Sequence, residues 1–482
     1  MTGYLLLTGA TGLLGRYLVC DLLESGNQLA LLVRSSKNEK AVERIEAILQ
    51  LRERETGRQL PRPVVLEGDI CKPFLGLSSN DLQWVTRHCT SMLHSAASLK
   101  FHADGTGEPW TSNVEGTRNM LALCEAAKLR RLHYVSTAYV CGLREEVAFE
   151  SELDCGQSFR NEYEESKLQA EKLVRAATFI DQLTVYRPAV ISGDSKTGYT
   201  NTYHGLYLYL RVMSILVPRQ PIGPDGLRNT PLRVAQTGEE RRNVVPVDWV
   251  SKAMTRLYNN RDAHGHTFNM APDECLTPRQ IMEAGYTYFS SKGVEFLGPD
   301  YKPDSYNAFE AETFPGLAMY NNYEKTDPTF DCSNLKRFAG DAPCPKIDEA
   351  MLHTYIRFGE ADRWGKRRQP GIVTPFYVGE YFSKFPQTFG DECFRSQVAL
   401  DLFGPGGGQW TLGLLSDGTL KCEPGLDKQA DSLIKLSVEE FKGMLEEPIA
   451  NIHKHATKQF FPISFIEPAK QRSHPSRETA NG

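Results

Sequence analysis

The pattern of apolar and polar positions in residues 1–275 predicts a parallel β-sheet. Short apolar runs alternate with longer stretches in which apolar residues recur every three or four positions, which is typical of βαβ units. The expected strands are Tyr4–Leu7, Gln28–Val33, Val64–Glu67, Ser91–His94, Arg131–Ser136 and Leu183–Arg187. The expected helices are Leu13–Ser25, Lys40–Arg52, Val114–Ala127 and Glu164–Ala177. This order predicts an α/β fold with a doubly wound parallel sheet.

Beyond the expected sheet the pattern becomes helical and irregular, and then changes again. Residues 195–240 and 275–359 are expected to supply a small substrate-binding portion interleaved with the sheet. A polar stretch closed by Pro and Gly predicts a linker, and a tail rich in Pro, Ser and Arg predicts disorder. The expected divisions are a first domain at 1–359, a linker at 360–371, a second domain at 372–466 and a disordered tail at 467–482.

The second domain shows short alternating runs separated by glycine-rich turns, followed by one amphipathic helix. We expect a small α/β domain whose last helix begins at the capping box Ser437–Glu440. Its expected strands are Gln397–Phe403, Gln409–Leu415, Thr419–Glu423 and Asp431–Leu436.

Composition and charge exclude several classes of protein. The chain has 482 residues, enough for two to four domains of roughly 100 to 200 residues each. Its 55 basic and 60 acidic residues leave a net charge of −5, which argues against nucleic acid as the main partner. No apolar run approaches the roughly 20 residues that span a membrane. The eleven cysteines are scattered without a Cys-x-x-Cys pair, so we expect reduced thiols, a cytoplasmic location and no metal site.

A glycine-rich turn follows the first expected strand and opens the first expected helix. Gly9 would allow a tight turn, Gly12 a close approach of backbone to phosphate, and Gly15 the packing of helix on strand. The helix N-terminus would add partial positive charge, so this turn is a candidate pyrophosphate site. The expected cofactor-binding residues of the turn are Gly9, Thr11, Gly12, Leu13, Leu14 and Gly15.

The second expected strand ends at Arg34, where a site for NAD would usually carry an acidic residue. A guanidinium with neighbouring hydroxyls can bind a 2′-phosphate, so NADPH is favoured over NADH. The alternative is that Arg34 is a solvated loop cation.

Tyr163 and Lys167 open a helical pattern and lie four residues apart, so they share one face of the helix. A nearby ammonium lowers the pKa of a tyrosine, which would make Tyr163 a general acid or base. Thr137 ends a strand 26 residues earlier, where its hydroxyl could polarise a substrate carbonyl.

These features together resemble the extended short-chain dehydrogenase/reductase superfamily, which has a Rossmann fold. The resemblance is greatest to the branch of fatty acyl reductases, male sterility proteins and thioester reductases. The motifs that carry it are Thr8–Gly15, Gly68–Ile70, His94–Ala97, Asn113–Thr117, Val135–Tyr139, Tyr163–Lys167, Tyr186–Pro188, Gly193–Gly198 and Val245–Asp248.

The resemblance implies a role for each matching position. Thr137 corresponds to the catalytic Ser or Thr, Tyr163 to the proton donor, and Lys167 to the residue that binds the nicotinamide ribose and tunes the tyrosine. Asn113 is interpreted as structural, and His94 and His102 as loop-packing residues. Further positions implied in cofactor binding are Asp69 and Ile70 at the adenine, Ala96 and Ala97 along the cofactor, and Pro188 and Val190 at the nicotinamide.

The second domain resembles the sterol carrier protein type-2 family, whose small α/β fold encloses a lipid-sized tunnel. The resemblance rests on Gln409–Leu420 and Ala430–Phe441. It implies tunnel or core positions for Trp410, Leu412, Leu414 and Phe441.

The resemblances imply an NADPH-dependent reductase that converts a hydrophobic acyl thioester, on coenzyme A or an acyl-carrier protein, to an aldehyde or alcohol. An alternative keeps the cofactor and oxidises or reduces a ketone or alcohol on a lipid-like, steroid-like or polyketide-like metabolite. A third hypothesis is a lipid-binding or regulatory protein that senses nucleotides, and the intact Thr137, Tyr163 and Lys167 argue against it.

Overall fold

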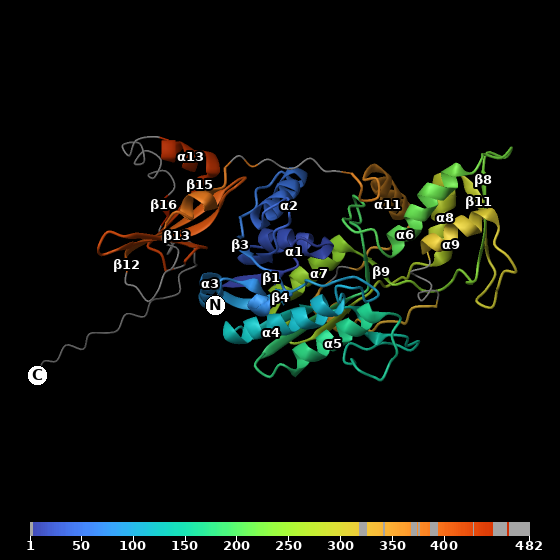
Figure 1. The fold of residues 1–482 in the computed structure, drawn as a ribbon, viewed down its shortest axis with the longest axis horizontal. Coiled ribbons are helices and arrows are strands. Elements are labelled where there is room, and N and C mark those ends of the chain that lie inside the picture. The colour runs from blue at the N-terminus through green and yellow to red at the C-terminus, as the bar shows by residue number, and fades with distance from the viewer. Residues whose placement is uncertain are drawn as a thin grey trace, which may run out of the picture. The chain divides into compact units, whose positions relative to one another are not determined.

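The fold is that of a computed structural model of the chain. The structure describes residues 3–317, 325–340, 343–367, 374, 376–385, 394–427, 429–446 and 460–461. It divides into two compact units, residues 1–45 with 65–371 and residues 46–64 with 372–482. Each unit contains a β-sheet with helices packed on it (Figure 1).

A seven-stranded sheet forms the centre of the first unit. Its strands are β1 (Tyr4–Thr8), β2 (Leu29–Val33), β3 (Val64–Glu67), β4 (Cys89–His94), β5 (Arg131–Val135), β6 (Gln182–Pro188) and β10 (Thr267–Met270). Their order is β10-β6-β5-β4-β1-β2-β3, and β1 pairs in parallel with both β2 and β4. The chain order therefore reverses at β1 and β4, which is where doubly wound sheets bind their ligands.

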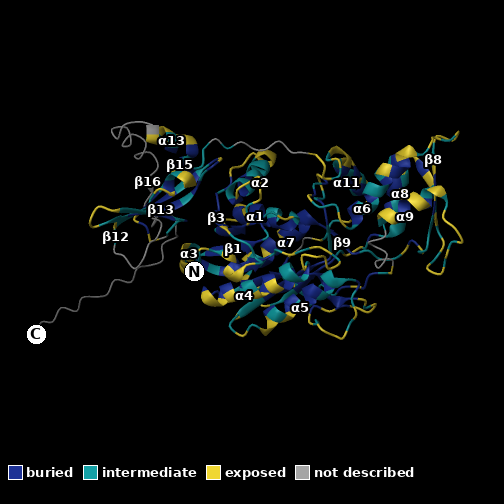
Figure 2. Ribbon diagram, in the orientation of Figure 1, coloured by how far each residue is buried: buried dark blue, intermediate teal, exposed yellow. Residues whose placement is uncertain are grey.

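Helices cover both faces of this sheet, with α1 and α7 on one face and α4 and α5 on the other (Figure 1). All residues of β1 and β2 are buried (Figure 2). The helices are α1 (Leu13–Glu24), α2 (Ala41–Thr56), α3 (Ser79–His88), α4 (Gly116–Ala126), α5 (Glu162–Ala176) and α7 (Val247–Asn259). Short helical turns are η1 (Pro73–Gly76), η2 (Thr111–Glu115), η3 (Ala138–Cys141), η4 (Val217–Arg219) and η5 (Arg261–Ala263). The α/β prediction is confirmed, and each expected strand and helix of residues 1–190 occurs within a few residues of its expected bounds.

The small portion of the first unit contains helices and short strand pairs. Its elements are β7 (Val190–Ser192), α6 (Leu206–Leu216), β8 (Arg228–Val234), β9 (Val244–Pro246), α8 (Pro278–Phe289), β11 (Ser291–Phe296), α9 (Ala308–Leu317), α10 (Ser333–Phe338) and α11 (Glu349–Ala361). β8 pairs in parallel with β11, and β7 with β9. The sequence analysis did not identify these four strands, because they are short and two of them carry charged residues.

The helix α11 runs into the expected linker. It ends at Ala361, and the ring of Trp364 packs against Gly359 and lies 5.6 Å from the ring of Tyr203. The first residues of the 360–371 stretch are therefore folded against the first unit.

The second unit contains a five-stranded sheet in the order β14-β13-β12-β15-β16. Its elements are α12 (Val378–Phe382), β12 (Phe394–Phe403), β13 (Gly408–Leu415), β14 (Leu420–Pro424), β15 (Ser432–Ser437), α13 (Val438–Glu446) and β16 (Phe460–Phe461). The expected capping box is present, because the Ser437 hydroxyl accepts from the Glu440 amide and the Glu440 carboxylate accepts from the Ser437 amide. Trp410 and Phe441 lie in the apolar core of this unit. The expected disordered tail at 467–482 lies outside the described residues.

Candidate active site

The glycine turn between β1 and α1 has the form of a pyrophosphate cradle. Gly9 has a φ of 77°, which favours glycine, and a Cβ on Gly15 would lie 1.9 Å from the Gly9 carbonyl oxygen. Gly12 is the N-cap of α1 and has no side chain to occupy the first backbone amides of the helix. Those amides and the helix dipole remain available to an anion, so the turn fits a dinucleotide.

Two guanidinium groups lie beyond the turn, at the end of β2 and on α2. Arg34 is 71% exposed, and one of its nitrogens lies 3.6 Å from the Asp69 carboxylate. Arg44 donates to the Arg34 carbonyl and, at 3.0 Å, to the Thr11 hydroxyl. The sequence analysis missed Arg44, because only the fold brings α2 to the glycine turn.

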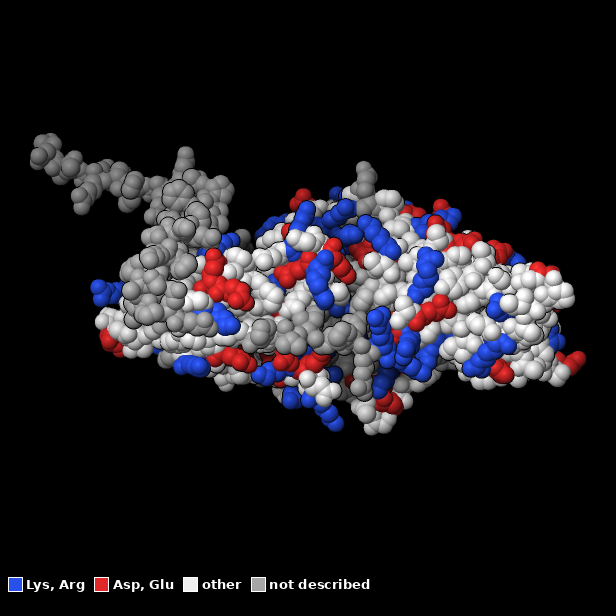
Figure 3. Space-filling model, turned by 90° about the horizontal axis from the view of Figure 1, so that it is seen from above, with Lys and Arg blue, Asp and Glu red and all other residues white. Residues whose placement is uncertain are grey.

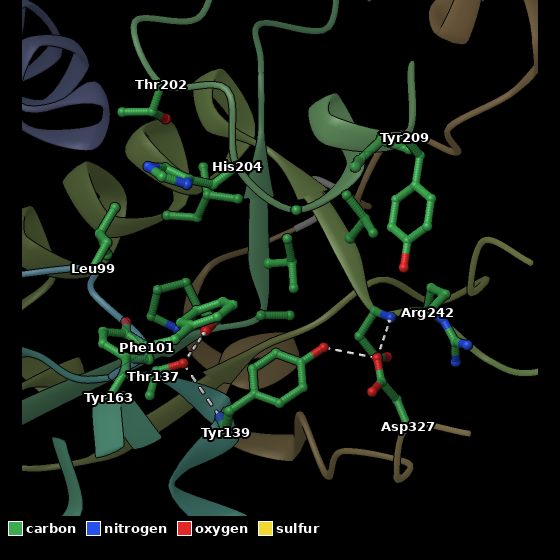
Figure 4. Close-up of a pocket in the computed structure, with 18 of the residues that line it drawn as sticks. Leu99, Phe101, Thr137, Tyr139, Tyr163, Thr202, His204, Tyr209, Arg242 and Asp327 are labelled. Atoms are coloured by element: carbon green, nitrogen blue, oxygen red, sulfur yellow. Dashed lines mark hydrogen bonds between the residues drawn. The ribbon is translucent and has the colours of Figure 1, made fainter. Parts of the chain in front are cut away.

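Thr137, Tyr163 and Lys167 line one cavity, as the sequence analysis proposed. The Thr137 hydroxyl lies at the carboxyl end of β5, where it donates to the Pro188 carbonyl at 3.4 Å and accepts from the Tyr139 amide at 3.3 Å (Figure 4). Tyr163 stands beside Thr137 on the first turn of α5 (Figure 4). Two hydroxyl groups therefore face the same space at the strand-order reversal.

Lys167 is buried, and its ammonium has neutral partners. It donates to the Val135 carbonyl at 2.8 Å and to the Tyr134 hydroxyl at 3.4 Å, and it lies 4.8 Å from the centre of the Tyr134 ring. Burial lowers the pKa of Lys167 to about 8, although the nearby Glu171 carboxylate opposes this shift.

The pKa of Tyr163 differs from our expectation. We expected the Lys167 ammonium to lower it, but burial raises the pKa of Tyr163 to about 12, with the Thr137 hydroxyl opposing the shift. The physical reason is that the ammonium is bonded to Val135 and Tyr134 rather than to the phenol. At neutral pH Tyr163 therefore holds its proton, as a general acid must.

The cavity has a volume of about 610 Å³ and joins the candidate catalytic residues to the glycine turn. The expected site residues that line it are Gly9, Gly12, Leu13, Leu14, Gly15, Ala97, Thr137, Tyr163, Lys167, Pro188 and Val190. The expected residues outside its lining are Thr11, Arg34, Asp69, Ile70 and Ala96. Four of these lie near the Arg34 end of the turn or in the adjoining loop, and Ala96 passes behind Gly9, because its backbone amide would be 2.7 Å from a Cβ there.

The rest of the cavity is mainly apolar and comes from the small portion of the first unit. Its apolar side chains include Leu206, Leu232, Val234, Ile281, Met282, Phe296, Phe314 and Leu317. A polar group lies in the same wall, where the Tyr139 hydroxyl donates to Asp327 at 2.7 Å and the Asn243 amide donates to the same oxygen at 3.0 Å (Figure 4). Tyr139 could have been proposed from its place two residues after Thr137, but nothing in the sequence pointed to Asp327.

The two histidines singled out in the sequence do not line the cavity. His94 is buried, and its ring nitrogen bonds the Thr8 hydroxyl at 2.9 Å. Burial lowers the pKa of His94 to about 3, so it is neutral at pH 7. Asn113 ties the loop after β4 to α5, because its side chain bonds the Ser98 backbone and the Ser166 hydroxyl.

Two further features bear on the kind of protein. Among the described residues, no three His, Cys, Asp or Glu side chains are grouped so that they could hold a metal ion. No helix in the described part of the chain is both long and apolar enough to cross a membrane.

Comparison with known proteins adds to this geometry. The family model described as male sterility protein matches residues 7–254. A linear gramicidin synthase of Brevibacillus parabrevis is 33% identical over 367 residues, which are 72% of this chain and 7% of that protein. The fatty acyl-CoA reductase wat of Drosophila melanogaster is 24% identical over 323 residues, which are 58% of this chain and 60% of that protein.

The fold has a solved counterpart. The terminal R domain from the myxalamid PKS-NRPS biosynthetic pathway is similar with a TM-score of 0.59 at 24% identity, over 76% of this chain and 93% of that domain. The chain spans 36% of the length of each of two fungal peptide synthetases that it matches, from Aspergillus hancockii and Aspergillus campestris.

Proposed function

Because the chain belongs to the male sterility protein family, we propose that it is an NADPH-dependent reductase that converts a hydrophobic acyl thioester to an aldehyde or alcohol. The matched region contains the glycine turn and the three candidate catalytic side chains. The observation that carries the proposal is the single cavity, which joins these residues to an apolar wall large enough for an acyl chain.

The cofactor assignment rests on the two guanidinium groups at the end of β2 and on α2. When bound, NADPH would supply the hydride, with the glycine turn holding its pyrophosphate and Lys167 its nicotinamide ribose. Arg34 and Arg44 would bind the 2′-phosphate, which only the phosphorylated cofactor carries. Asp69 beside Arg34 would help to orient its guanidinium.

Thr137 and Tyr163 are the groups that act on the substrate carbonyl. Since Tyr163 is protonated at neutral pH, it can donate first a hydrogen bond and then its proton to the oxygen as negative charge develops there. The Thr137 hydroxyl can turn from the Pro188 carbonyl to the same oxygen. Collapse of the resulting hemithioacetal would release an aldehyde and a thiol.

The carrier of the acyl group is proposed from the relatives. Their names include nonribosomal peptide synthetases and a fatty acyl-CoA reductase, which supports a thioester on an acyl-carrier protein or on coenzyme A. The cysteines in the described part of the chain are free thiols, which supports a cytoplasmic location.

The role of the second domain is likewise a proposal. We infer that residues 372–466 form a sterol carrier-like domain that holds the apolar part of substrate or product, with 1–359 as the reductase domain and 360–371 as the linker. The support is a sheet whose apolar face, with Trp410 and Phe441, is packed against short helices.

The experiment is an assay of the full chain with NADPH and a panel of acyl-CoA thioesters, ketones and alcohols. Oxidation of NADPH and release of free thiol are measured together. Thiol release in step with NADPH oxidation supports the proposal. NADPH oxidation by ketones without thiol release would instead support the ketone or alcohol oxidoreductase.

A further inference from the structure

The apolar wall of the cavity contains a partition. Leu232 on β8 and Met282 on α8 line the main cavity, and both also line a second cavity of about 30 Å³ behind it. These two side chains therefore separate the space that the candidate catalytic residues face from a smaller space in the core of the small portion.

The rear cavity is suited to hydrocarbon. Its two threonine hydroxyls are already bonded, since Thr230 donates to the Lys292 carbonyl at 2.9 Å and Thr313 to the Phe309 carbonyl at 2.7 Å. Its volume is that of about one water-sized group. The apolar residues that complete its lining are Val212, Met213, Leu216, Val217, Val294 and Phe309.

Met282 is the more adaptable part of the partition. It is partly buried and packs against the core of the small portion, whereas Leu232 is buried. A methionine side chain is unbranched and turns about three bonds, so it fills a boundary of this kind without fixing it rigidly. On the next turn of α8, a Cβ on Gly285 would meet the Met213 sulfur at 2.7 Å, so Met213 closes the far side of the rear cavity.

We propose that Met282, with Leu232, sets the longest acyl chain that the enzyme accepts. The inference rests on the proposed function, because it assigns this apolar wall to the acyl group of a thioester. The other side of the thioester carries a large polar group that would remain unsolvated in such a wall, so the hydrocarbon is the part that enters it.

The expected size of the effect follows from apolar burial. Each additional buried methylene contributes about 0.8 kcal/mol, which is about fourfold in kcat/KM. Met282→Ala removes three heavy atoms beyond Cβ and opens the rear cavity. The limit should then move by about three carbons, and the kcat/KM of the longer thioesters relative to shorter ones should rise by at least about tenfold.

The experiment uses the full chain, NADPH and saturated acyl-CoA thioesters of increasing length, with thiol release as the readout. For each protein the ratio of kcat/KM between long and short chains is compared, so that a general loss of activity cancels. Met282→Ala should shift the optimum to longer chains. Met282→Phe should shift it to shorter chains, and it provides the test if the alanine variant does not fold.

Met213→Ala is the matched control, because it enlarges the rear cavity and keeps the partition, so the optimum should stay where the wild type has it. An active wild type whose optimum moves with neither Met282 variant would overturn this inference alone. A wild type that releases thiol from none of the thioesters would overturn the proposed function, and the chain-length limit with it.

Discussion

Burial has opposite effects on the two titratable groups of the candidate site. It raises the pKa of Tyr163 to about 12 and lowers that of Lys167 to about 8, because each neutral form is favoured away from water. One group therefore keeps its proton throughout the physiological range, while the other changes charge at its upper end. Each shift leads to a separate prediction.

Replacing Tyr163 by Phe removes the proposed proton donor and leaves a ring of nearly the same size. We expect kcat to fall by about a hundredfold or more, with NADPH affinity largely retained. Steady-state kinetics and NADPH titration measure the two effects separately. Near-normal turnover would remove Tyr163 from the mechanism.

Lys167 predicts a decline in activity at alkaline pH. Its ammonium is present below pH 8 and is lost as the pH rises through its folded pKa of about 8. The NADPH dissociation constant should therefore increase above pH 8, while Lys167→Ala should bind weakly at pH 7 and show no step near pH 8. The sign for stability is opposite. Since the unfolded lysine keeps its proton up to its ordinary pKa of 10.5, this group makes the free energy of unfolding rise between those values.

Arg34→Ala and Arg44→Ala should weaken NADPH much more than NADH. A charged hydrogen bond to the 2′-phosphate contributes about 1.5 to 3 kcal/mol, so each variant should raise the KM for NADPH by about 10- to 100-fold. Arg54→Ala, in the last turn of the same helix, is the control. Equal effects on both cofactors would show that the two arginines do not read the phosphate.

At the scale of elements, the site depends on how the first helix meets the first strand. The turn has no spare volume, because a Cβ at residue 15 would lie 1.9 Å from the carbonyl oxygen of Gly9 and 2.7 Å from its carbon. These are backbone atoms, and they cannot move without opening the turn that positions the helix amides.

Gly15→Ala should therefore reduce NADPH affinity by at least about tenfold and destabilise the protein by about 1 to 3 kcal/mol. Gly105→Ala is the control, since a Cβ there meets nothing within 4 Å. NADPH titration and thermal unfolding of both variants test the prediction. Unchanged binding by Gly15→Ala would show that the turn does not hold the dinucleotide.

At the scale of the whole molecule, acidic and basic side chains are interspersed over the face shown in Figure 3, as the net charge of −5 suggests. Such a face provides no broad field of one sign. Partner choice is therefore expected to depend on the cavity and on the second domain rather than on long-range attraction.

Deleting residues 372–482 tests the proposed role of the second domain. If it presents apolar substrate to the reductase, the truncated chain should keep near-normal kcat on short thioesters and show a KM raised several-fold for long ones. Circular dichroism and thermal unfolding check that the remainder is folded. A truncated protein that unfolds, or one whose loss is the same for all chain lengths, would make this domain a structural element instead.

The sequence by itself determined the features that depend on neighbouring residues. The helix and strand periods predicted the α/β order, the glycine spacing predicted the turn before α1, and the four-residue spacing placed Tyr163 and Lys167 on one face of α5. These signals are local, because backbone geometry relates residues within one or two turns.

Only the tertiary structure decided the features that depend on burial and on distant segments. It brought Arg44 to Thr11 and Asp327 to Tyr139, and it made Met282 and Leu232 a shared partition. It also reversed the expected pKa shift of Tyr163. That shift depends on desolvation and on the partners of the neighbouring ammonium, which are set by packing between elements rather than by the sequence around either residue.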